Sequence, residues 1–131
     1  MSVFVDTSAI YALLVADDGR HDQAKTILTS LRHENAALVS TSFVVHESVA
    51  LLQSRIGIGA ARTFHQNVFP ALDIDWIDAA RYERAMVALL AANTRHLSLT
   101  DWISFDTMRG RGIERVFAFD THFTEQGFRL E

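Results

Sequence analysis

The sequence contains no cysteine, which excludes disulfide bridges and thiolate metal sites. No apolar run approaches the roughly 20 residues that a membrane-spanning helix needs. The N-terminal residues also lack the basic segment and long apolar core of a secretory signal. We therefore expect a cytoplasmic protein that makes no membrane contact.

Proline and lysine are scarce, since each occurs once, as Pro70 and Lys25. With one proline and only six glycines, no segment has the composition of a linker or a low-complexity tract. Hydrophobic residues make up 49% of the chain, too large a share for a disordered protein. Because 131 residues is a usual length for one domain, residues 1–131 are predicted to form a single domain.

Basic residues are fewer than acidic ones, 12 against 16, and the formal net charge is −4 at pH 7. Nucleic-acid-binding domains are usually basic, so the net charge by itself argues against that class of partner. Eleven of the twelve basic residues are arginine, however, and arginine favours bidentate contact with phosphate. The placement of the acidic residues is therefore more informative than their number.

Short apolar strands alternate with helical segments along the chain. Strands are predicted at 3–5, 37–41, 72–77 and 116–119, with an edge strand at 128–130. Helices are predicted at 8–15, 22–32, 43–56, 60–68, 78–93, 99–109 and 121–126. In the helix capped by Asp78, the residues expected to face the core are Tyr82, Met86, Leu89 and Leu90. The alternation predicts a three-layer α/β/α sandwich with a central, mainly parallel sheet.

Two of these strands lead into an aspartate that is followed by a hydroxyl residue. The stretch SVFVDTSAI places Asp6 after the first strand, and RVFAFDTHF places Asp120 after a late one. Ligand sites of parallel α/β sheets lie beyond the carboxyl ends of the strands, so both carboxylates are expected at the same edge of the sheet. Each aspartate also fits the simpler role of a helix N-cap.

Two further acidic residues occupy positions from which they can join this site. Glu47, in FVVHESVALL, has apolar side chains one turn before and after it and no cation with which to pair. Such a carboxylate is costly unless it binds a metal or reaches solvent at the edge of the apolar stripe. Asp101, in SLTDW, forms a capping-box pattern with Ser98, and a carboxylate in the first turn of a helix also faces the sheet edge.

Carboxylates gathered in this way favour a hard divalent cation. The lack of cysteine and of paired histidines argues against zinc, whereas oxygen ligands suit Mg²⁺ or Mn²⁺. Without a cation the four acids would repel one another, and some would stay protonated. A cation held with several waters can activate a water for in-line attack on a phosphodiester.

The same residues make the chain resemble the PIN-domain ribonucleases, and among them the VapC-type toxins of toxin–antitoxin pairs. The resemblance covers nearly the whole chain and rests on VDTSAIYALL, HESVALL and SLTDWISFDTMRGRGIERVFAFDTHF. The family's four acids, its small hydroxyl residue and its helix serine fall, in that order, on Asp6, Glu47, Asp101, Asp120, Ser8 and Ser104. No acid of the family pattern is missing.

The resemblance implies an Mg²⁺- or Mn²⁺-dependent endoribonuclease that cuts tRNA or ribosomal RNA. Asp6, Asp101 and Asp120 would bind the metal directly or through water, and Glu47 would complete the shell or orient the attacking water. Ser8 would hydrogen-bond a ligand carboxylate or water, unless it serves only the helix start. The resemblance also implies a homodimer and a small cognate antitoxin that covers the site.

Other interpretations stay open on the sequence alone. A PIN-like domain can act in RNA processing, or serve as a non-catalytic module that binds RNA or protein. A receiver-type phosphoacceptor would need a lysine after a late strand, and a phosphatase with an aspartate nucleophile would need Asp-x-Asp where Asp6-Thr7-Ser8 stands. Metal-dependent cleavage of RNA separates the nuclease from the binding module.

Histidines and arginines near the acids have less certain roles. His46 and His122 adjoin the acidic positions, but a metal-activated water needs no histidine, so we interpret them as supporting or surface residues. Candidates for contact with RNA phosphates fall into two groups, with solvated surface as the alternative: Arg81 and Arg84, and Arg109, Arg111 and Arg115.

Overall fold

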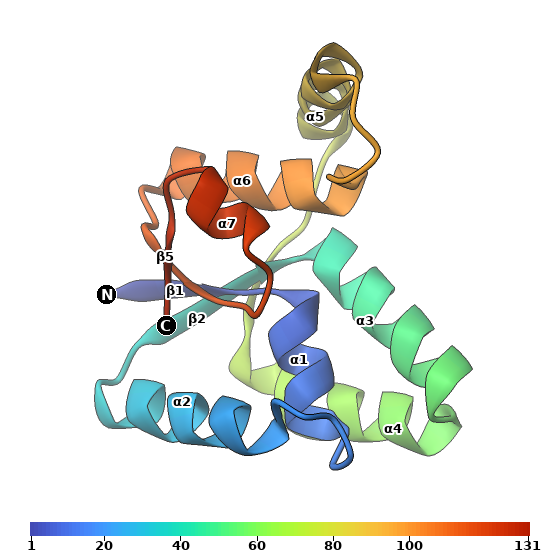
Figure 1. The fold of residues 1–131 in the computed structure, drawn as a ribbon, viewed down its shortest axis with the longest axis vertical. Coiled ribbons are helices and arrows are strands. Elements are labelled where there is room, and N and C mark those ends of the chain that lie inside the picture. The colour runs from blue at the N-terminus through green and yellow to red at the C-terminus, as the bar shows by residue number, and fades with distance from the viewer.

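Five parallel strands form one central sheet, here described from a computed structural model that covers residues 1–131 (Figure 1). The order across the sheet is β3 (Asp73–Asp75), β2 (Ala37–Thr41), β1 (Ser2–Val5), β4 (Arg115–Phe117) and β5 (Arg129–Leu130). In the middle strand, Phe4 lies opposite Val39 on one side and Val116 on the other. The pairing of β1 with β4 therefore joins the first and last parts of the chain.

Helices cover both faces of the sheet, so the predicted three-layer α/β/α fold is confirmed. On one side lie α1 (Thr7–Leu14), α2 (His21–His33) and α4 (Ile58–Thr63), and on the other lie α6 (Leu99–Arg111) and α7 (His122–Glu125) (Figure 1). One end is flanked by α3 (Ser42–Arg55), and α5 (Ala79–Ala92) lies beyond α6. None of these helices combines the length and the apolar character needed to cross a membrane.

Most predicted elements match the observed ones within a few residues, and the differences have local causes. The third strand covers only Asp73–Asp75, and the fourth ends at Phe117. The helix predicted at 60–68 is divided, because α4 ends at Thr63 and a π-helical turn follows at Phe64–Val68. A 3-10 turn at Phe69–Ala71 then ends the segment, since Pro70 has no amide hydrogen to continue a helical ladder.

Two helices begin directly at the carboxyl edge of the sheet because strand-end residues cap them. Asp6 follows β1 and accepts a hydrogen bond from Ser8 N at the start of α1. Thr41 is the last residue of β2, and its hydroxyl accepts from Val44 N at the start of α3. With side-chain caps in place, neither helix needs a connecting loop. The first turns of α1 and α3 therefore lie at the sheet edge where a ligand site is expected.

An aromatic cluster ties α6 and α7 to the sheet. Phe105 is fully buried, with its ring 5.6 Å from Trp102, 5.3 Å from Phe123 and 6.0 Å from Phe128. Phe123 in turn lies 6.5 Å from Phe4 in the middle strand. Phe4, Phe105 and Phe123 are fully buried, Trp102 and Phe128 are half-buried, and the tilted, edge-on and stacked contacts of the rings add to the apolar burial.

The helix α5 packs mainly against α6, and the prediction of its inner face is wrong for Tyr82 and Leu90, whereas Met86 and Leu89 are half-buried. Ala85 is the only buried residue of the helix, whereas Tyr82 and Leu90 are 38% and 69% exposed. Their apolar side chains have no layer to pack against, because α6 separates α5 from the sheet (Figure 1).

Arginines instead fix α5 to its neighbours. Arg81 bonds the carboxylate of Asp75 and the hydroxyl of Thr107. Arg84 makes a two-pronged ion pair with Asp106 of α6, with N–O distances of 2.9 and 2.8 Å. Bidentate arginine–carboxylate pairs have defined geometry, so these contacts set the orientation of α5 on α6.

Candidate active site

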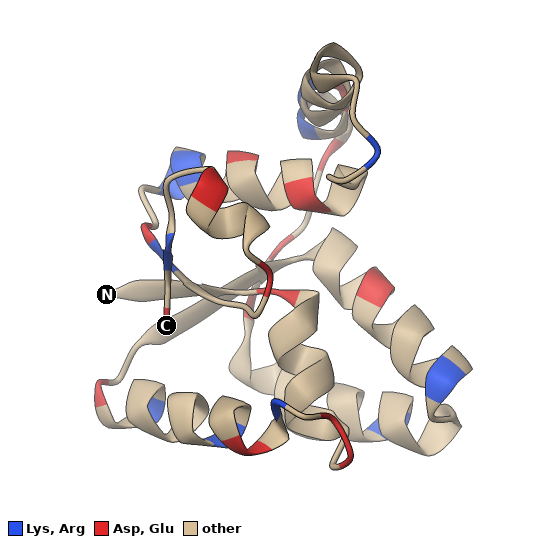
Figure 2. Ribbon diagram, in the orientation of Figure 1, with Lys and Arg blue, Asp and Glu red and all other residues tan.

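The predicted acidic residues gather at the carboxyl edge of the sheet. Asp6 directly follows β1, and its backbone N–H donates to Phe117 O at the end of β4 at 3.0 Å. Asp120 lies three residues beyond β4, in the loop before α7. Glu47 lies on α3 and Asp101 in the first turn of α6. Figure 2 shows acidic segments at the start of α1, on α3, on α6 and before α7.

Asp6 is the most deeply buried of the four acids. Only 5% of the residue is exposed, and burial raises the pKa of its carboxyl to about 6. Hydrogen bonds from Ser8 work against this rise, while the nearby charges of Asp101 and Glu47 add to it. No cation lies beside this carboxylate to offset the burial. Asp6 is therefore a buried acid that becomes negative only at some cost to the fold.

Ser8 connects the two strands that carry the first and last acids. Its hydroxyl donates to Asp6 Oδ2 at 2.7 Å and accepts from Phe119 N at 3.0 Å. Phe119 immediately precedes Asp120 in the chain. A single hydroxyl therefore fixes both the carboxylate of Asp6 and the backbone that positions Asp120.

Asp101 and Glu47 complete the acidic group. Asp101 forms the predicted capping box, since Ser98 N donates to Asp101 Oδ2 at 2.9 Å and Asp101 N donates to Ser98 Oγ at 3.1 Å. Burial raises the pKa of Asp101, and the charges of Asp120 and Glu47 raise it further. The cap and the site are therefore compatible, because the second carboxylate oxygen of Asp101 has no partner within the chain.

Asp120 and Ser104 occupy their positions through local hydrogen bonds. Asp120 Oδ1 accepts from His122 N at 3.0 Å, and the His122 ring nitrogen Nε2 lies 3.4 Å from the same oxygen. The other oxygen of Asp120 is left without a partner in the chain. Ser104 is fully buried and donates to Thr100 O at 2.9 Å, so its hydroxyl serves its own helix. Sequence reasoning associates Ser104 with the site, and its observed contact is within α6.

The neighbouring carboxylates help to raise the pKa values of Asp6 and Asp101, but the four acids do not form a complete set of metal ligands. No three acidic or histidine side chains are already arranged around one point as metal ligands. Asp6, Asp101 and Asp120 each engage one oxygen in a local hydrogen bond and leave the other free. This donor set fits Mg²⁺ or Mn²⁺, which bind few carboxylates and keep several waters in their shell.

The arginines that were candidates for RNA contact make hydrogen bonds or ion pairs within the chain. Arg81 and Arg84 hold α5, and Arg109 donates to the side chain of Gln126. Arg111 bonds the carboxylates of both Asp73 and Asp75. Arg115 bonds Glu131 and Glu34, which raises the pKa of its guanidinium well above the usual value. These five residues therefore shape the surface of the protein before any ligand arrives.

Arg20 makes a contact at the site that the sequence pattern does not reveal. Its guanidinium donates to Phe119 O at 2.9 Å and lies 5.1 Å from the centre of the Phe119 ring. Ser8 holds the N–H of the same residue, so Phe119 is fixed from both sides. Arg20 lies in a polar loop 99 residues away in the chain, and only the folded structure brings the two together.

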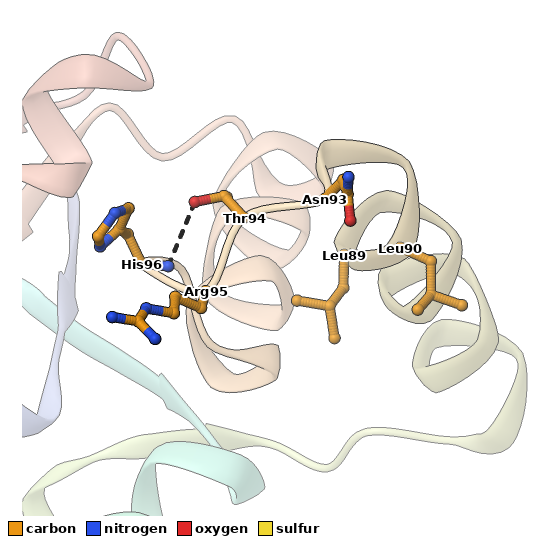
Figure 3. Close-up of a pocket in the computed structure, with 6 residues that line it drawn as sticks. All are labelled: Leu89, Leu90, Asn93, Thr94, Arg95 and His96. Carbon is orange, nitrogen blue, oxygen red and sulfur yellow. Dashed lines mark hydrogen bonds between the residues drawn. The ribbon is translucent and has the colours of Figure 1, made fainter.

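The largest hollow of the molecule lies away from the acids. It has a volume of about 540 Å³ and is formed by the end of α5 and the following loop, with Leu89, Leu90, Asn93, Thr94, Arg95 and His96 as its lining (Figure 3). The Arg95 and His96 side chains extend from the loop on the side away from α5 (Figure 3). The hollow contains no carboxylate and is wide open, so we place the chemistry at the acidic edge of the sheet.

Comparison with known proteins decides the family. A model of the PIN domain matches residues 3–129. The chain belongs to the PIN-domain family. It is 32% identical over 127 residues to VapC20, a 23S rRNA-specific endonuclease of Mycobacterium tuberculosis known from two strains, with 96% of this chain and 95% of the relative covered. The resemblance to VapC-type PIN domains drawn from the sequence is thereby confirmed.

Solved structures agree with this assignment. The crystal structure of M. tuberculosis VapC20, described as a toxin that cleaves the sarcin–ricin loop, superposes with a TM-score of 0.85 and covers 97% of this PIN-domain chain and 96% of its own. FitAcB of Neisseria gonorrhoeae, at 17% identity, gives a TM-score of 0.70 with 98% of this chain and 95% of that one covered. At that identity the match to FitAcB supports only the fold.

Proposed function

We propose that this PIN-domain protein is an Mg²⁺- or Mn²⁺-dependent endoribonuclease and the toxin of a toxin–antitoxin pair. The observation that carries the proposal is the set of four acids at one sheet edge, where Asp6 and Asp101 have raised pKa values and lack cationic partners. The similarity to VapC20, an endonuclease specific for 23S rRNA, supports ribosomal RNA over tRNA as the substrate class.

Each residue of the proposed site has its own role in the reaction. Asp6, Asp101 and Asp120 offer their free oxygens to a divalent ion, and Glu47 completes the shell or orients the attacking water. When bound, the ion supplies positive charge that makes water a stronger nucleophile and stabilises the charge that develops on the phosphate. Ser8 keeps Asp6 ionisable by hydrogen-bonding it, because each such bond lowers the pKa of the carboxyl. The products are expected to carry 5′-phosphate and 3′-hydroxyl ends.

Removal of the metal tests this function directly. The purified chain should cut a synthetic hairpin with the sarcin–ricin loop sequence in Mg²⁺ or Mn²⁺, EDTA should stop cleavage, and added metal should restore it. Asp120→Asn should slow cleavage by about a hundredfold or more, since it removes charge aimed at the reacting group. The rate is measured from the appearance of labelled fragments on a gel.

The matched control is Asp22→Asn, which neutralises an exposed carboxylate in the first turn of α2. It should cleave at the wild-type rate. Cleavage that continues in EDTA, or an Asp120→Asn variant as fast as Asp22→Asn, contradicts a metal-dependent site built on these acids. Binding of the hairpin without cleavage by the wild-type chain would favour the alternative function, a non-catalytic RNA-binding module.

A second copy of the chain and a small antitoxin are the proposed protein partners. Support for a homodimer comes from α5, where Val87 and Leu90 are 68% and 69% exposed. This helix packs on α6 and lies at the outside of the molecule (Figure 1). Apolar side chains in such a position favour a contact between copies. An enzyme that cuts ribosomal RNA in its own cell also needs an inhibitor, and the open acidic edge is the natural place for it to bind.

The dimer contact is tested by charge placed on α5. Light scattering should give the mass of two chains for the wild type, and Leu90→Glu should yield single chains because a buried, unpaired carboxylate is costly. The control is Ile58→Glu, at a residue of α4 that is 63% exposed, and it should remain a dimer. A dimeric Leu90→Glu protein would place the interface elsewhere.

A further inference from the structure

A small hollow lies between the N-terminal parts of α3 and α6, the two helices that carry Glu47 and Asp101. It has a volume of about 210 Å³ and is lined by Ser42, Phe43, His46 and Thr100. Ser42 and Phe43 open α3, and Thr100 lies in the first turn of α6. Thr100 directly precedes Asp101, and His46 directly precedes Glu47. Two of the four lining residues are therefore neighbours in the chain of proposed site acids.

Phe43 stands apart from every other phenylalanine in the chain. Of the nine phenylalanines, five belong to the buried core and three pack against it, which leaves Phe43 as the only one outside it. Its ring also makes no contact with another aromatic ring, although the other eight phenylalanines all do. A half-buried aromatic ring without a packing role is a candidate for ligand contact.

The position of Phe43 on α3 links it to the acids. Phe43 and Glu47 are four residues apart, so their side chains lie on the same face of the helix. His46 follows Phe43 by three residues and flanks the same face. The apolar ring that lines the hollow and the proposed catalytic carboxylate therefore lie one turn apart on the same face of α3.

From this arrangement we infer that the hollow receives one nucleobase of the RNA, stacked against Phe43 and His46, next to the phosphate that is cut. This inference rests on the proposed nuclease function and adds the substrate contact that the acids cannot provide. Every base has a π-face, so stacking on aromatic side chains is a general way to hold single-stranded RNA. The volume is below the 300–1,000 Å³ that is typical of pockets for drug-sized ligands, which limits the occupant to about one planar group.

Two hydroxyls at the rim can meet the edge of the base or its ribose. Ser42 Oγ accepts from Ile77 N at 3.0 Å, which leaves its own proton free to donate. The Thr100 hydroxyl makes no hydrogen bond within the chain, because only the backbone oxygen of Thr100 is engaged. The lining contains no lysine, arginine, aspartate or glutamate, so it suits a base better than a phosphate.

The test uses fluorescence of a stacked base. In the Asp120→Asn background, which should cut RNA slowly enough for binding to be measured, a sarcin–ricin loop hairpin carries 2-aminopurine at each purine position in turn. At one position next to the cleaved bond, binding should quench the fluorescence. Phe43→Leu should abolish this quenching and weaken hairpin binding by about tenfold, the loss typical of one base–aromatic stack, whereas Phe43→Tyr should keep both.

Controls separate this inference from the nuclease proposal and from misfolding. Phe43→Leu keeps an apolar side chain at the position, and its melting temperature should equal that of Phe43→Tyr. His46→Ala should weaken binding, and the matched His33→Ala, at an exposed histidine that ends α2, should not. If the wild type cuts the hairpin but Phe43→Leu binds it with unchanged affinity and quenching, the base pocket is overturned and the nuclease stands. If no variant binds the hairpin, the base pocket and the proposed substrate are both overturned.

Discussion

Asp6→Asn should make the metal-free protein more stable and at the same time remove RNA cleavage. The carboxyl of Asp6 is buried without a cation, and its pKa rises from 3.8 to about 6. A shift of that size corresponds to about 3 kcal/mol of unfolding free energy at pH 7. Asparagine has the same shape and can still accept from Ser8, but its amide N–H groups need partners, so we expect a gain of about 1–2 kcal/mol. Cleavage should fall by about a hundredfold or more.

The stability difference between Asp6→Asn and the wild type should depend on pH. Between pH 3.8 and about 6 the folded wild type holds a proton on Asp6 that the unfolded chain releases, so its stability falls as the pH rises through this window. Asp101, whose pKa is also raised by burial, acts in the same direction. Urea unfolding in EDTA should therefore give the variant a larger free energy of unfolding than the wild type at pH 7.5 and nearly the same value at pH 4.

Addition of metal should make the wild type more stable than Asp6→Asn. Mg²⁺ that binds only the folded state stabilises it by mass action, and the wild type has the stronger site. The melting temperature of the wild type should rise more than that of Asp6→Asn when Mg²⁺ replaces EDTA. Equal shifts in both proteins, or a stability difference that does not change with pH, would mean that Asp6 bears neither the buried charge nor the metal.

Phe105→Ala should cause the largest loss of stability among single changes near the site. The ring is fully buried and is surrounded by Trp102, Phe123 and Phe128. Removal of a buried phenylalanine ring costs about 3–5 kcal/mol through lost apolar burial and the cavity left behind. For a domain of this length that corresponds to a drop in melting temperature on the order of 10–20 °C. Urea unfolding followed by tryptophan fluorescence measures it.

Loss of Phe105 should also weaken metal binding, because its ring joins α6, which carries Asp101, to Phe123 of α7, the helix that follows Asp120. Phe105→Leu is the conservative variant and should lose less than half as much stability. Tyr82→Ala is the exposed control, and surface changes of this kind usually stay within about 0.5 kcal/mol. A Phe105→Ala protein that loses less than about 1 kcal/mol would show that the aromatic cluster does not hold α6 and α7 in place.

The sheet and the acidic edge follow from local patterns in the sequence. Fully apolar strands such as Val3–Val5 signal a parallel sheet buried on both faces, and an aspartate after such a strand must lie at the ligand-binding edge. The capping box at Ser98 and Asp101 is equally local and is present as predicted. These features depend on residues within a few positions of one another, which is why they can be predicted without a structure.

Features that depend on distant contacts were missed or wrongly predicted. The exposed face of α5 reflects the position of α6 between α5 and the sheet, which no periodicity within α5 reveals. The ion pairs of the arginines that are candidates for RNA contact were missed because their acids are distant in the chain, as Asp73 is 38 residues from Arg111. The hollow at Phe43 exists only because two helix starts meet, and a phenylalanine in an apolar run looks like any core residue.

The hydrogen bond between Ser8 and Phe119 also has a consequence for the order in which the site appears during synthesis. The two residues are 111 positions apart, and β1 can pair with β4 only after nearly the whole chain has left the ribosome. Domains emerge N-terminal end first at about 5–20 residues per second, so Asp6 is exposed for several seconds before Asp120 exists. The proposed nuclease is therefore expected to be inert while it is being made, because Asp6 and Asp120 come together only after β4, near the end of the chain, has been synthesised.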